Sequence, residues 1–251
     1  PETAPGATSR MAAQDVDQLA AWQRTNGVKL DVAFNGAGAA DQKAETGSDA
    51  LEASLLANKN EFRWINHTWS HPYLGCVHDD SMTPWQCAKT STGVINWASQ
   101  ATIASEISKN VAYAKTNTLP NFDAASLVTG EHSGLKSLPQ MPADNPYLAP
   151  ALTQQRIKWI ASDASRESEP RVLGSATTVP RHPMNIYYNT STKANAVDEY
   201  NWLYTSRADG GSGLCEDNPA TSTCITPLTQ DGFDSYIVPK EKQIALGHVL
   251  D

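Results

Sequence analysis

Residues 62–76 read FRWINHTWSHPYLGC, and this stretch decides the fold class that we expect for the chain. Its first residues, up to Ile65, include three apolar side chains and predict a short buried strand. Pro72 then stops any regular element. Because His67 and His71 stand between the strand and the stop, the stretch predicts a strand that ends in a turn carrying two imidazole groups.

The four-residue spacing of His67 and His71 is compatible with one metal ion only if the chain coils after the strand. In a helical turn the two rings lie one above the other and can bind the same ion. In a continuing strand they would stand about 13 Å apart, at ~3.3 Å of rise per residue. Two histidines at this spacing also occur as ordinary core or surface residues, but a position directly after a buried strand is where α/β folds place their chemistry.

Strands and helices alternate along the rest of the chain, which predicts a parallel sheet covered by helices, either open or closed into a barrel. Helices are expected at Met11–Gln23, at Ser48–Asn60 with Ser48 as N-cap, and at Ser99–Thr116, Ala151–Arg156 and Ala194–Thr205. Besides the strand before His67, strands are expected at Val28–Phe34, Ala125–Thr129, Ile157–Ala161, Met184–Tyr188 and Gln243–Leu250. No linker-like segment interrupts the sequence, so residues 1–251 are expected to form one domain.

The composition limits the classes of partner and compartment. The 251 residues carry a net charge of −8 and no cluster of Lys and Arg, so nucleic acid is not an expected partner. No apolar run is long enough to predict a membrane span. The four cysteines form two local pairs, Cys76 with Cys87 and Cys215 with Cys224, without the C-x-x-C spacing of a zinc site. Two disulfides predict a secreted protein from an oxidising compartment, and we expect a monomer.

The run Asn66–His71 resembles the second motif, H-[ST]-x-x-H, of the NodB-type polysaccharide deacetylases. The wider sequence resembles one branch of that superfamily, the secreted deacetylases of galactosamine-containing exopolysaccharides, which are associated with biofilms. The stretches that carry the wider resemblance are LDVAFNGAG (30–38), GEHSGL (130–135), ASDASR (161–166), NIYYN (185–189) and DEYNW (198–202).

The resemblance implies a distorted (β/α) barrel and metal-dependent N-deacetylation of an extracellular N-acetylhexosamine polymer, with N-acetylgalactosamine preferred. It also implies that His67 and His71 bind one divalent metal ion, expected to be Zn²⁺. Deacetylation requires a polarised amide carbonyl and an activated water, which a divalent ion supplies. A carboxylate and a histidine then transfer the protons.

The acidic part of this chemistry is not evident in the sequence. The resemblance implies an aspartate pair on a strand before the first helix, but residues 1–10 contain no aspartate. Either that strand precedes residue 1, as the spacing favours, or Asp15, Asp17 or Asp31 replaces it. Asp31 is the candidate catalytic residue of the three, because a carboxylate within an apolar strand is costly unless it is paired.

His248 is the second candidate catalytic residue. The family places its catalytic histidine after a strand like the one expected at 243–250, whereas His248 lies within that strand and the chain stops at Asp251. The alternative for His248 is a purely structural role. The domain is therefore expected to be truncated at both ends.

Four further residues are candidates for binding the sugar. His132 lies on a glycine-flanked loop after one expected strand, and Asp163 with Arg166 follows the next strand, so the three are expected to face one mouth of the fold. Trp69, between the two histidines, is a candidate platform for a sugar ring. The alternatives are a loop histidine bonded to backbone, a surface ion pair and a core tryptophan.

Two other classes of function compete with the deacetylase interpretation. A carbohydrate-binding domain of the same fold without catalysis is favoured by the missing acidic motif. A glycoside hydrolase requires two carboxylates at one cleft, and Glu131 with Asp163 is the pair that we nominate.

Overall fold

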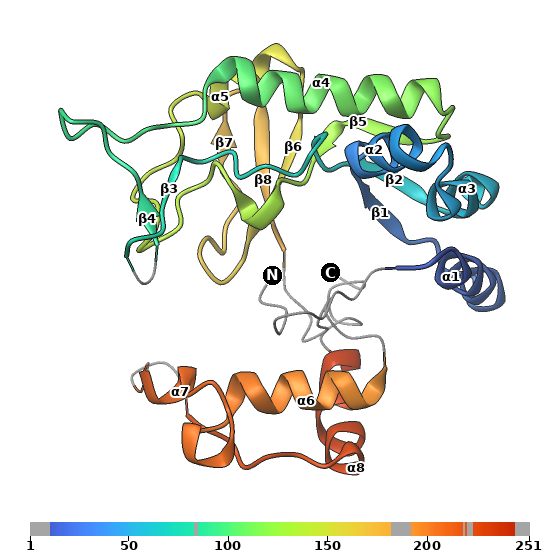
Figure 1. Ribbon diagram of the computed structural model, residues 1–251, viewed down its shortest axis with the longest axis vertical. Helices are drawn as coiled ribbons and strands as arrows, with labels where there is room; N and C mark the ends of the chain where they lie inside the picture. Colours follow the sequence, from blue (N-terminus) through green and yellow to red (C-terminus); the bar gives the residue numbers. More distant parts are fainter. Residues whose placement is uncertain (1–10, 83–84, 182–191, 218, 220–222, 244–251) are drawn as a thin grey trace. The chain divides into compact units, whose positions relative to one another are not determined.

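The computed structural model describes residues 11–82, 85–181, 192–217, 219 and 223–243. The sequence leads us to expect one domain, whereas the contacts within the chain divide it into two compact units. One unit is Met11–His182, and the other comprises Pro183–Asp251 with the first ten residues. The first of these contains the α/β sheet (Figure 1).

The larger unit is built on a six-stranded sheet with the order β1-β2-β5-β6-β8-β7. Its strands are β1 (Asp31–Phe34), β2 (Arg63–Asn66), β5 (Phe122–Leu127), β6 (Trp159–Asp163), β7 (Val172–Leu173) and β8 (Ala176–Arg181). All neighbours are parallel except β7 and β8, so the predicted α/β class with a parallel sheet is confirmed. Because β1 and β7 are free edges, the sheet is open within the described part of the chain and does not close into the expected distorted barrel.

Helices and one small second sheet complete this unit. The helices are α1 (Ala13–Asn26), α2 (Ala37–Thr46), α3 (Ala50–Ala57), α4 (Gln100–Thr116) and α5 (Leu148–Gln154), with the 3₁₀ turns η1 (Lys59–Glu61) and η2 (Gly130–His132). The second sheet pairs β3 (His78–Asp79) antiparallel with β4 (Gln86–Cys87), inside the loop that the Cys76–Cys87 disulfide closes.

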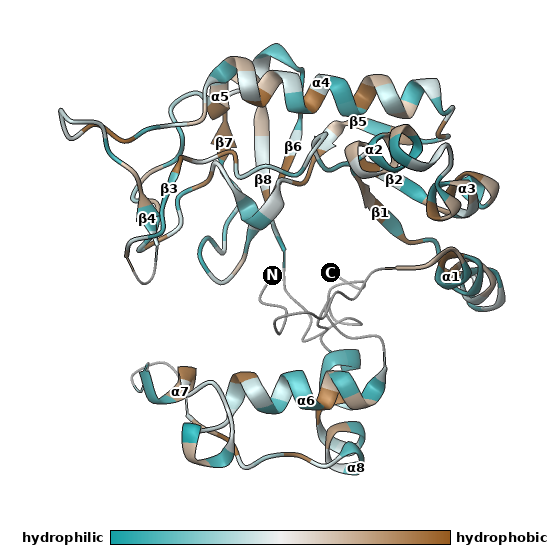
Figure 2. Cartoon of the chain, in the orientation of Figure 1, coloured by the Kyte–Doolittle hydropathy of each residue, from teal (hydrophilic) through white to brown (hydrophobic). Residues whose placement is uncertain are grey.

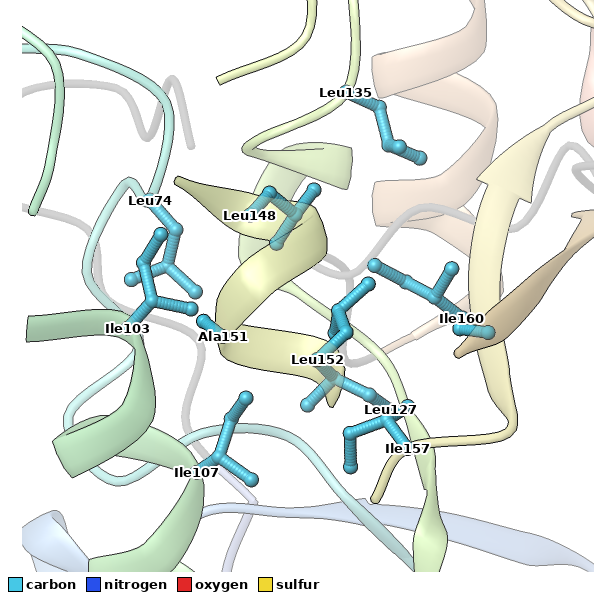
Figure 3. Packing of buried hydrophobic residues seen from close by; sticks show 11 residues of the cluster. Leu74, Ile103, Ile107, Leu127, Leu135, Leu148, Ala151, Leu152, Ile157 and Ile160 are labelled. Atoms are coloured by element: carbon cyan, nitrogen blue, oxygen red, sulfur yellow. The ribbon is translucent and has the colours of Figure 1, made fainter. Parts of the chain in front are cut away.

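Helices α4 and α5 cover one face of the sheet and supply its main core (Figure 3). Ser99, where the sequence predicts that this helix begins, caps α4 by accepting a hydrogen bond from the N–H of Thr102. Figure 2 shows hydrophobic and hydrophilic residues alternating along α4, as the helical period requires. Its buried Ile103 and Ile107 pack with side chains of α5 and of strands β5 and β6.

A second cluster lies at the other end of the sheet, where α1 and α3 pack beside β1 and β2. Phe34 and Trp64 meet edge to face in this cluster, with ring centroids 5.7 Å apart. Gly27 ends α1 in the left-handed conformation (φ 65°), four residues beyond the expected end of this helix at Gln23.

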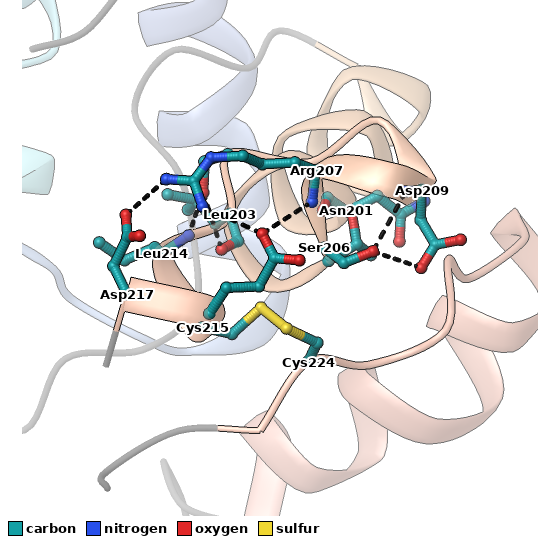
Figure 4. The surroundings of a disulfide bond; sticks show 12 residues. Asn201, Leu203, Ser206, Arg207, Asp209, Leu214, Cys215, Asp217 and Cys224 are labelled. Carbon is teal, nitrogen blue, oxygen red and sulfur yellow. Dashed lines mark hydrogen bonds and ion pairs between the residues drawn. A yellow bond between two sulfur atoms is a disulfide. The ribbon is translucent and has the colours of Figure 1, made fainter. Parts of the chain in front are cut away.

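The smaller unit is helical in its described part. It contains α6 (Lys193–Tyr204), α7 (Leu214–Asp217) and α8 (Gln230–Gly232), with the 3₁₀ turn η3 (Arg207–Asp209) and the π-helical turn η4 (Phe233–Ile237). The Cys215–Cys224 disulfide ties α7 to the following segment, and Arg207 beside it bonds Glu216 and Asp217 (Figure 4). Both predicted disulfides are therefore confirmed, and they fit an oxidising compartment.

Several elements differ from the sequence-based expectation. Helix α3 begins after Asp49 rather than Ser48, because the Asp49 carboxylate accepts hydrogen bonds from two backbone N–H groups of the first turn. Strand β8, at Ala176–Arg181, precedes the expected strand Met184–Tyr188, which lies outside the described residues. The expected strand Gln243–Leu250 also lies outside them, apart from its first residue. None of the described helices is long and apolar enough to cross a membrane.

Candidate functional site

The carboxyl ends of the parallel strands meet at one edge of the sheet, and most of the candidate residues lie there. His67 directly follows β2, and Gly130 lies just past the end of β5. Asp163 and Arg181 are the last residues of β6 and β8, and they stand opposite each other in the register of these two strands. The strand order thus gathers side chains at the edge where parallel α/β sheets bind their ligands.

His67 and His71 face each other across the turn that follows β2. Their ring centroids lie 4.6 Å apart and the ring planes are inclined at 74°. The Nδ1–H group of His67 donates a hydrogen bond to the carbonyl oxygen of Val128 at 2.8 Å, which leaves Nε2 as the nitrogen with a free lone pair. Burial lowers the pKa of His67 despite this hydrogen bond, and the charge of Arg181 acts in the same direction. The ring is therefore neutral at neutral pH, which is the form that binds a metal ion.

The turn that carries the histidines adopts a left-handed backbone at two non-glycine residues, Thr68 (φ 64°) and His71 (φ 56°). Such conformations cost free energy and persist where surrounding contacts enforce them. One of these contacts joins the turn to the start of α2, since the carbonyl of Trp69 accepts a hydrogen bond from the N–H of Ala37 at 3.1 Å.

The loop after β5 packs against the ring of His71. Gly130 lies against the His71 ring so closely that a Cβ atom at this position would stand 2.5–2.8 Å from three ring atoms. The next two residues, Glu131 (φ 55°) and His132 (φ 53°), are also left-handed. Glycine is thus favoured at 130 by close approach, and the loop beside it stores backbone strain.

A second group of side chains, His132, Asp163, Arg166 and Arg181, lies beside the histidine pair. Nη2 of Arg181 donates to Nδ1 of His132 at 3.2 Å, and Nε of Arg166 pairs with Asp163 at 3.3 Å. Burial and the charge of Arg181 lower the pKa of His132. Burial acts to raise the pKa of Asp163, but hydrogen bonds from Ser165 and nearby positive charges outweigh it and lower that pKa. The group therefore presents a neutral imidazole beside an ionised carboxylate and two guanidinium groups.

An open cavity of about 930 Å³ adjoins this second group, and Arg166 is part of its wall. Leu138 and Pro142 give the wall an apolar part, and the ion pair of Arg171 with Asp144 gives it a polar part. Small-molecule sites have volumes of this order and combine apolar walls with a few polar groups.

Two donor groups for a metal ion are present at this edge of the sheet. The imidazoles of His67 and His71 are ligands that suit Zn²⁺. Among the described residues, no group of three His, Cys, Asp or Glu side chains is placed to hold an ion. The residues thus fit two positions of a tetrahedral site, and the other positions require water or groups outside the described part of the chain.

The structure places Asp31 away from this edge. It is the first residue of β1, at the amino end of the strand and opposite Arg63 in the register. Its carboxylate pairs with the guanidinium of Arg63 at 2.6 Å on the surface. The length of β2, about 13 Å at ~3.3 Å per residue, separates Arg63 from His67. The pairing expected of a carboxylate in a strand is therefore made with Arg63, and Asp31 cannot act on a group bound at His67.

Trp69 and His248 are the remaining candidates. The half-buried ring of Trp69 packs edge to face on Tyr113, with centroids 5.3 Å apart, and covers Gly36. These contacts match the packing alternative for Trp69 rather than a sugar platform. His248 lies outside the described residues.

Three residues of this region are absent from the candidates drawn from the sequence. Arg181 was not selected because Pro180 suggests that no strand continues through it. The preceding β-branched residues are nevertheless typical of a strand that ends at 181. Glu106 and Asn110 lie on the buried face of α4, one helical turn apart. Polar residues placed within the apolar stripe of a helix are the signal that could have found them.

No family model matches the chain, and no curated protein matches its sequence. Among solved structures, the chain is similar to the crystal structure of Agd3, described as a novel carbohydrate deacetylase, with a TM-score of 0.58 and 20% sequence identity. The match covers 83% of this chain and 37% of that chain, so this chain spans little more than a third of the length of that structure. At this level of identity the similarity shows the fold, and this chain shares the α/β fold of a solved carbohydrate deacetylase.

Proposed function

We propose that the chain carries out metal-dependent N-deacetylation of an N-acetylhexosamine polysaccharide, with N-acetylgalactosamine as the preferred sugar. The observation that carries the proposal is the pair of facing imidazoles, His67 and His71, at the carboxyl edge of a parallel sheet. Orientation of His67 by a backbone carbonyl supports it, because metal-binding histidines are commonly held through their second nitrogen. The fold shared with a carbohydrate deacetylase supports the same class of reaction.

The proposal assigns a role to each group at this edge. A bound divalent ion, expected to be Zn²⁺, supplies a polarised amide carbonyl and a water of lowered pKa. His67 and His71 hold the ion through neutral nitrogens. His132, Asp163 and Arg166 bind the hydroxyl groups of the sugar, and the adjoining cavity accommodates neighbouring units of the polymer. The carboxylate that accepts the proton comes from outside the described residues, and His248 stays the candidate acid.

An extracellular polymer is consistent with the chemistry of the chain. Two disulfides fit an oxidising compartment, and a net charge of −8 favours a neutral or cationic substrate over an anionic one. A polymer of N-acetylgalactosamine becomes cationic as its acetyl groups are removed.

The test is the zinc content of the purified chain, combined with acetate release from an N-acetylgalactosamine polymer. We expect about one equivalent of zinc per chain, and His67→Ala should lose both the metal and acetate release. His78→Ala is the matched control, because His78 stacks on Trp85 in the first disulfide loop, outside the proposed site. Acetate release by His67→Ala at the wild-type rate would contradict the proposal.

A carbohydrate-binding domain without catalysis is the second candidate. The observation that favours it is that only two potential metal ligands come together among the described residues. It predicts that the chain retains no zinc, releases no acetate, and still binds the polymer in a pull-down assay. Release of reducing ends instead of acetate would point to a glycoside hydrolase.

A further inference from the structure

The turn that carries the histidine pair is hydrogen-bonded to a single face of α4. Asn110 and Glu106 provide the bonds, and their spacing of four residues places both on that face. Asn110 is fully buried, and Glu106 is 9% exposed. Buried polar groups of this kind are costly unless their hydrogen bonds are made, so the partners that they find are informative.

Asn110 joins the ends of β1 and β2. Its Nδ2 group donates to the carbonyl of Phe34 at 2.6 Å and to Oδ1 of Asn66 at 2.9 Å. Its Oδ1 accepts a hydrogen bond from the N–H of Gly36 at 2.9 Å. Both ends of the amide are therefore satisfied, and the last residue of β2 is fixed to the helix just before His67.

Asn66 connects this hydrogen-bond network to the turn. Its Oδ1 accepts a second hydrogen bond, from the N–H of Thr68 at 3.0 Å, and its Nδ2 donates to the carbonyl of Ile107 on α4 at 3.1 Å. Thr68 is one of the two left-handed residues of the turn. The bond from Asn66 thus helps to hold a backbone conformation that would otherwise relax.

Glu106 holds the other side of the turn. Its carboxylate accepts one hydrogen bond from the N–H of Ser70 at 2.8 Å and another from the Ser70 hydroxyl at 3.1 Å. Hydrogen bonds to a carboxylate are stronger than neutral ones, and burial increases their strength. Ser70 directly precedes the left-handed residue His71, so the turn is fixed on both sides of the histidine pair.

We propose that Glu106 and Asn110 are positioning residues, which hold the turn through Ser70 and Asn66 so that His67 and His71 address one metal ion. The role rests on the proposed function, since it concerns the same two histidines. Both residues are buried, so they act through the turn. They act by setting the distance and angle between two imidazoles, which metal affinity depends on.

The test compares Zn²⁺ affinity, measured by competition with a chromophoric chelator, among variants of α4 and of the turn. Glu106→Ala should bind Zn²⁺ roughly 10- to 100-fold more weakly than the wild type. Glu106→Gln should recover most of the affinity, because the amide can still accept from the Ser70 N–H. Ile103→Val is the control for general loosening of the helix, since Ile103 packs in the core and makes no bond to the turn; its affinity should not change.

A readout without metal separates this inference from the proposed function. Hydrogen exchange of the Ser70 amide should accelerate in Glu106→Ala and stay unchanged in Ile103→Val, whether or not the wild type binds Zn²⁺. If the wild type binds no Zn²⁺ but this exchange pattern is found, the proposed function fails and the anchoring of the turn stands. Wild-type exchange and wild-type Zn²⁺ affinity in Glu106→Ala would overturn the inference. If Glu106→Ala does not fold, Ser70→Ala is the second variant, because it removes one hydrogen bond to Glu106 at an exposed residue. Ser70→Ala should also lower the Zn²⁺ affinity. An unchanged Zn²⁺ affinity in Ser70→Ala would overturn the inference.

Discussion

Polar side chains are exposed at one end of strands β1 and β2 and buried at the other. At the amino ends, Asp31 and Arg63 form an ion pair with both side chains largely exposed. At the carboxyl ends, Asn66 and Asn110 are fully buried and bonded to each other and to backbone. Exposed pairs contribute little to stability, whereas buried polar groups must be satisfied at every atom.

The difference indicates which end of the sheet is built for a defined geometry. Left-handed backbone at non-glycine residues occurs at the carboxyl edge, at Thr68, His71, Glu131 and His132, and also before strands β5 and β6, at Thr118, Asn121 and Arg156. At the carboxyl edge it coincides with the buried network of Asn66 and Asn110. Strain and buried polar networks together reduce the stability of a fold, and they are retained where side chains must be held in a fixed arrangement. At the amino ends of β1 and β2, by contrast, the polar pair Asp31–Arg63 lies on the surface.

The largest effect is expected from Asn66→Ala at the carboxyl end. The substitution leaves the buried N–H of Thr68 and the carbonyl of Ile107 without the partners that they have now. We expect a loss of about 3 kcal/mol in the free energy of unfolding, measured by urea denaturation. If the free energy of unfolding falls by less than it does when an exposed ion pair is removed, the contrast between the two ends is not supported.

Gly130→Ala should have the next largest effect. The new methyl group would overlap the His71 ring, so ring and loop must shift, at a cost of about 1–3 kcal/mol. Zn²⁺ affinity should fall at the same time, which competition with a chelator measures. Gly38→Ala is the matched control: no atom lies within 4 Å of the added Cβ, and alanine within α2 should stabilise the protein by roughly 0.5–1 kcal/mol. Equal effects of the two substitutions would show that the contact with His71 is not special.

A smaller effect is expected from Asp163 as the pH falls. Its pKa lies below the ordinary value in the folded chain, so its contribution to stability is present above about pH 4 and is lost as the pH falls through the folded pKa. For a carboxylate that shares an ion pair with an exposed arginine, the size should be roughly 0.5 kcal/mol. Urea denaturation at pH 5 and pH 3 should show a shallower loss for Asp163→Asn than for the wild type. A steeper loss of stability in Asp163→Asn than in the wild type would contradict the expected direction.

Asp31→Ala should have the smallest effect. Removal of this exposed partner of Arg63 should change the free energy of unfolding by no more than about 0.5 kcal/mol and leave Zn²⁺ affinity at the wild-type value. Thermal denaturation and chelator competition check the two parts. A loss of Zn²⁺ binding in this variant would return Asp31 to the proposed site.

Local patterns predicted much of the larger unit. The strand before His67, the helix that Ser99 caps and the cysteine pair Cys76–Cys87 are confirmed, because each depends on residues close together in the sequence. The sequence also placed His132 on a loop after one strand and Asp163 just past the next; in the structure His132 ends η2, which follows β5, and Asp163 is the last residue of β6. Strand β8 was missed because its proline is unfavourable in a strand. The segment is a strand because it pairs with β6 on one side and β7 on the other.

The sequence by itself determined that two histidines follow a strand and that the chain then turns, since spacing, apolar content and proline are local properties. Only the tertiary structure decided the partners of these residues: Val128 for His67, Gly130 for His71, and Arg63 for Asp31. Val128 and Gly130 follow β5, and Arg63 begins β2, so strand order and register bring each partner into place. The role of a charged or polar side chain depends on that environment, because burial and neighbouring charges set its protonation and its cost.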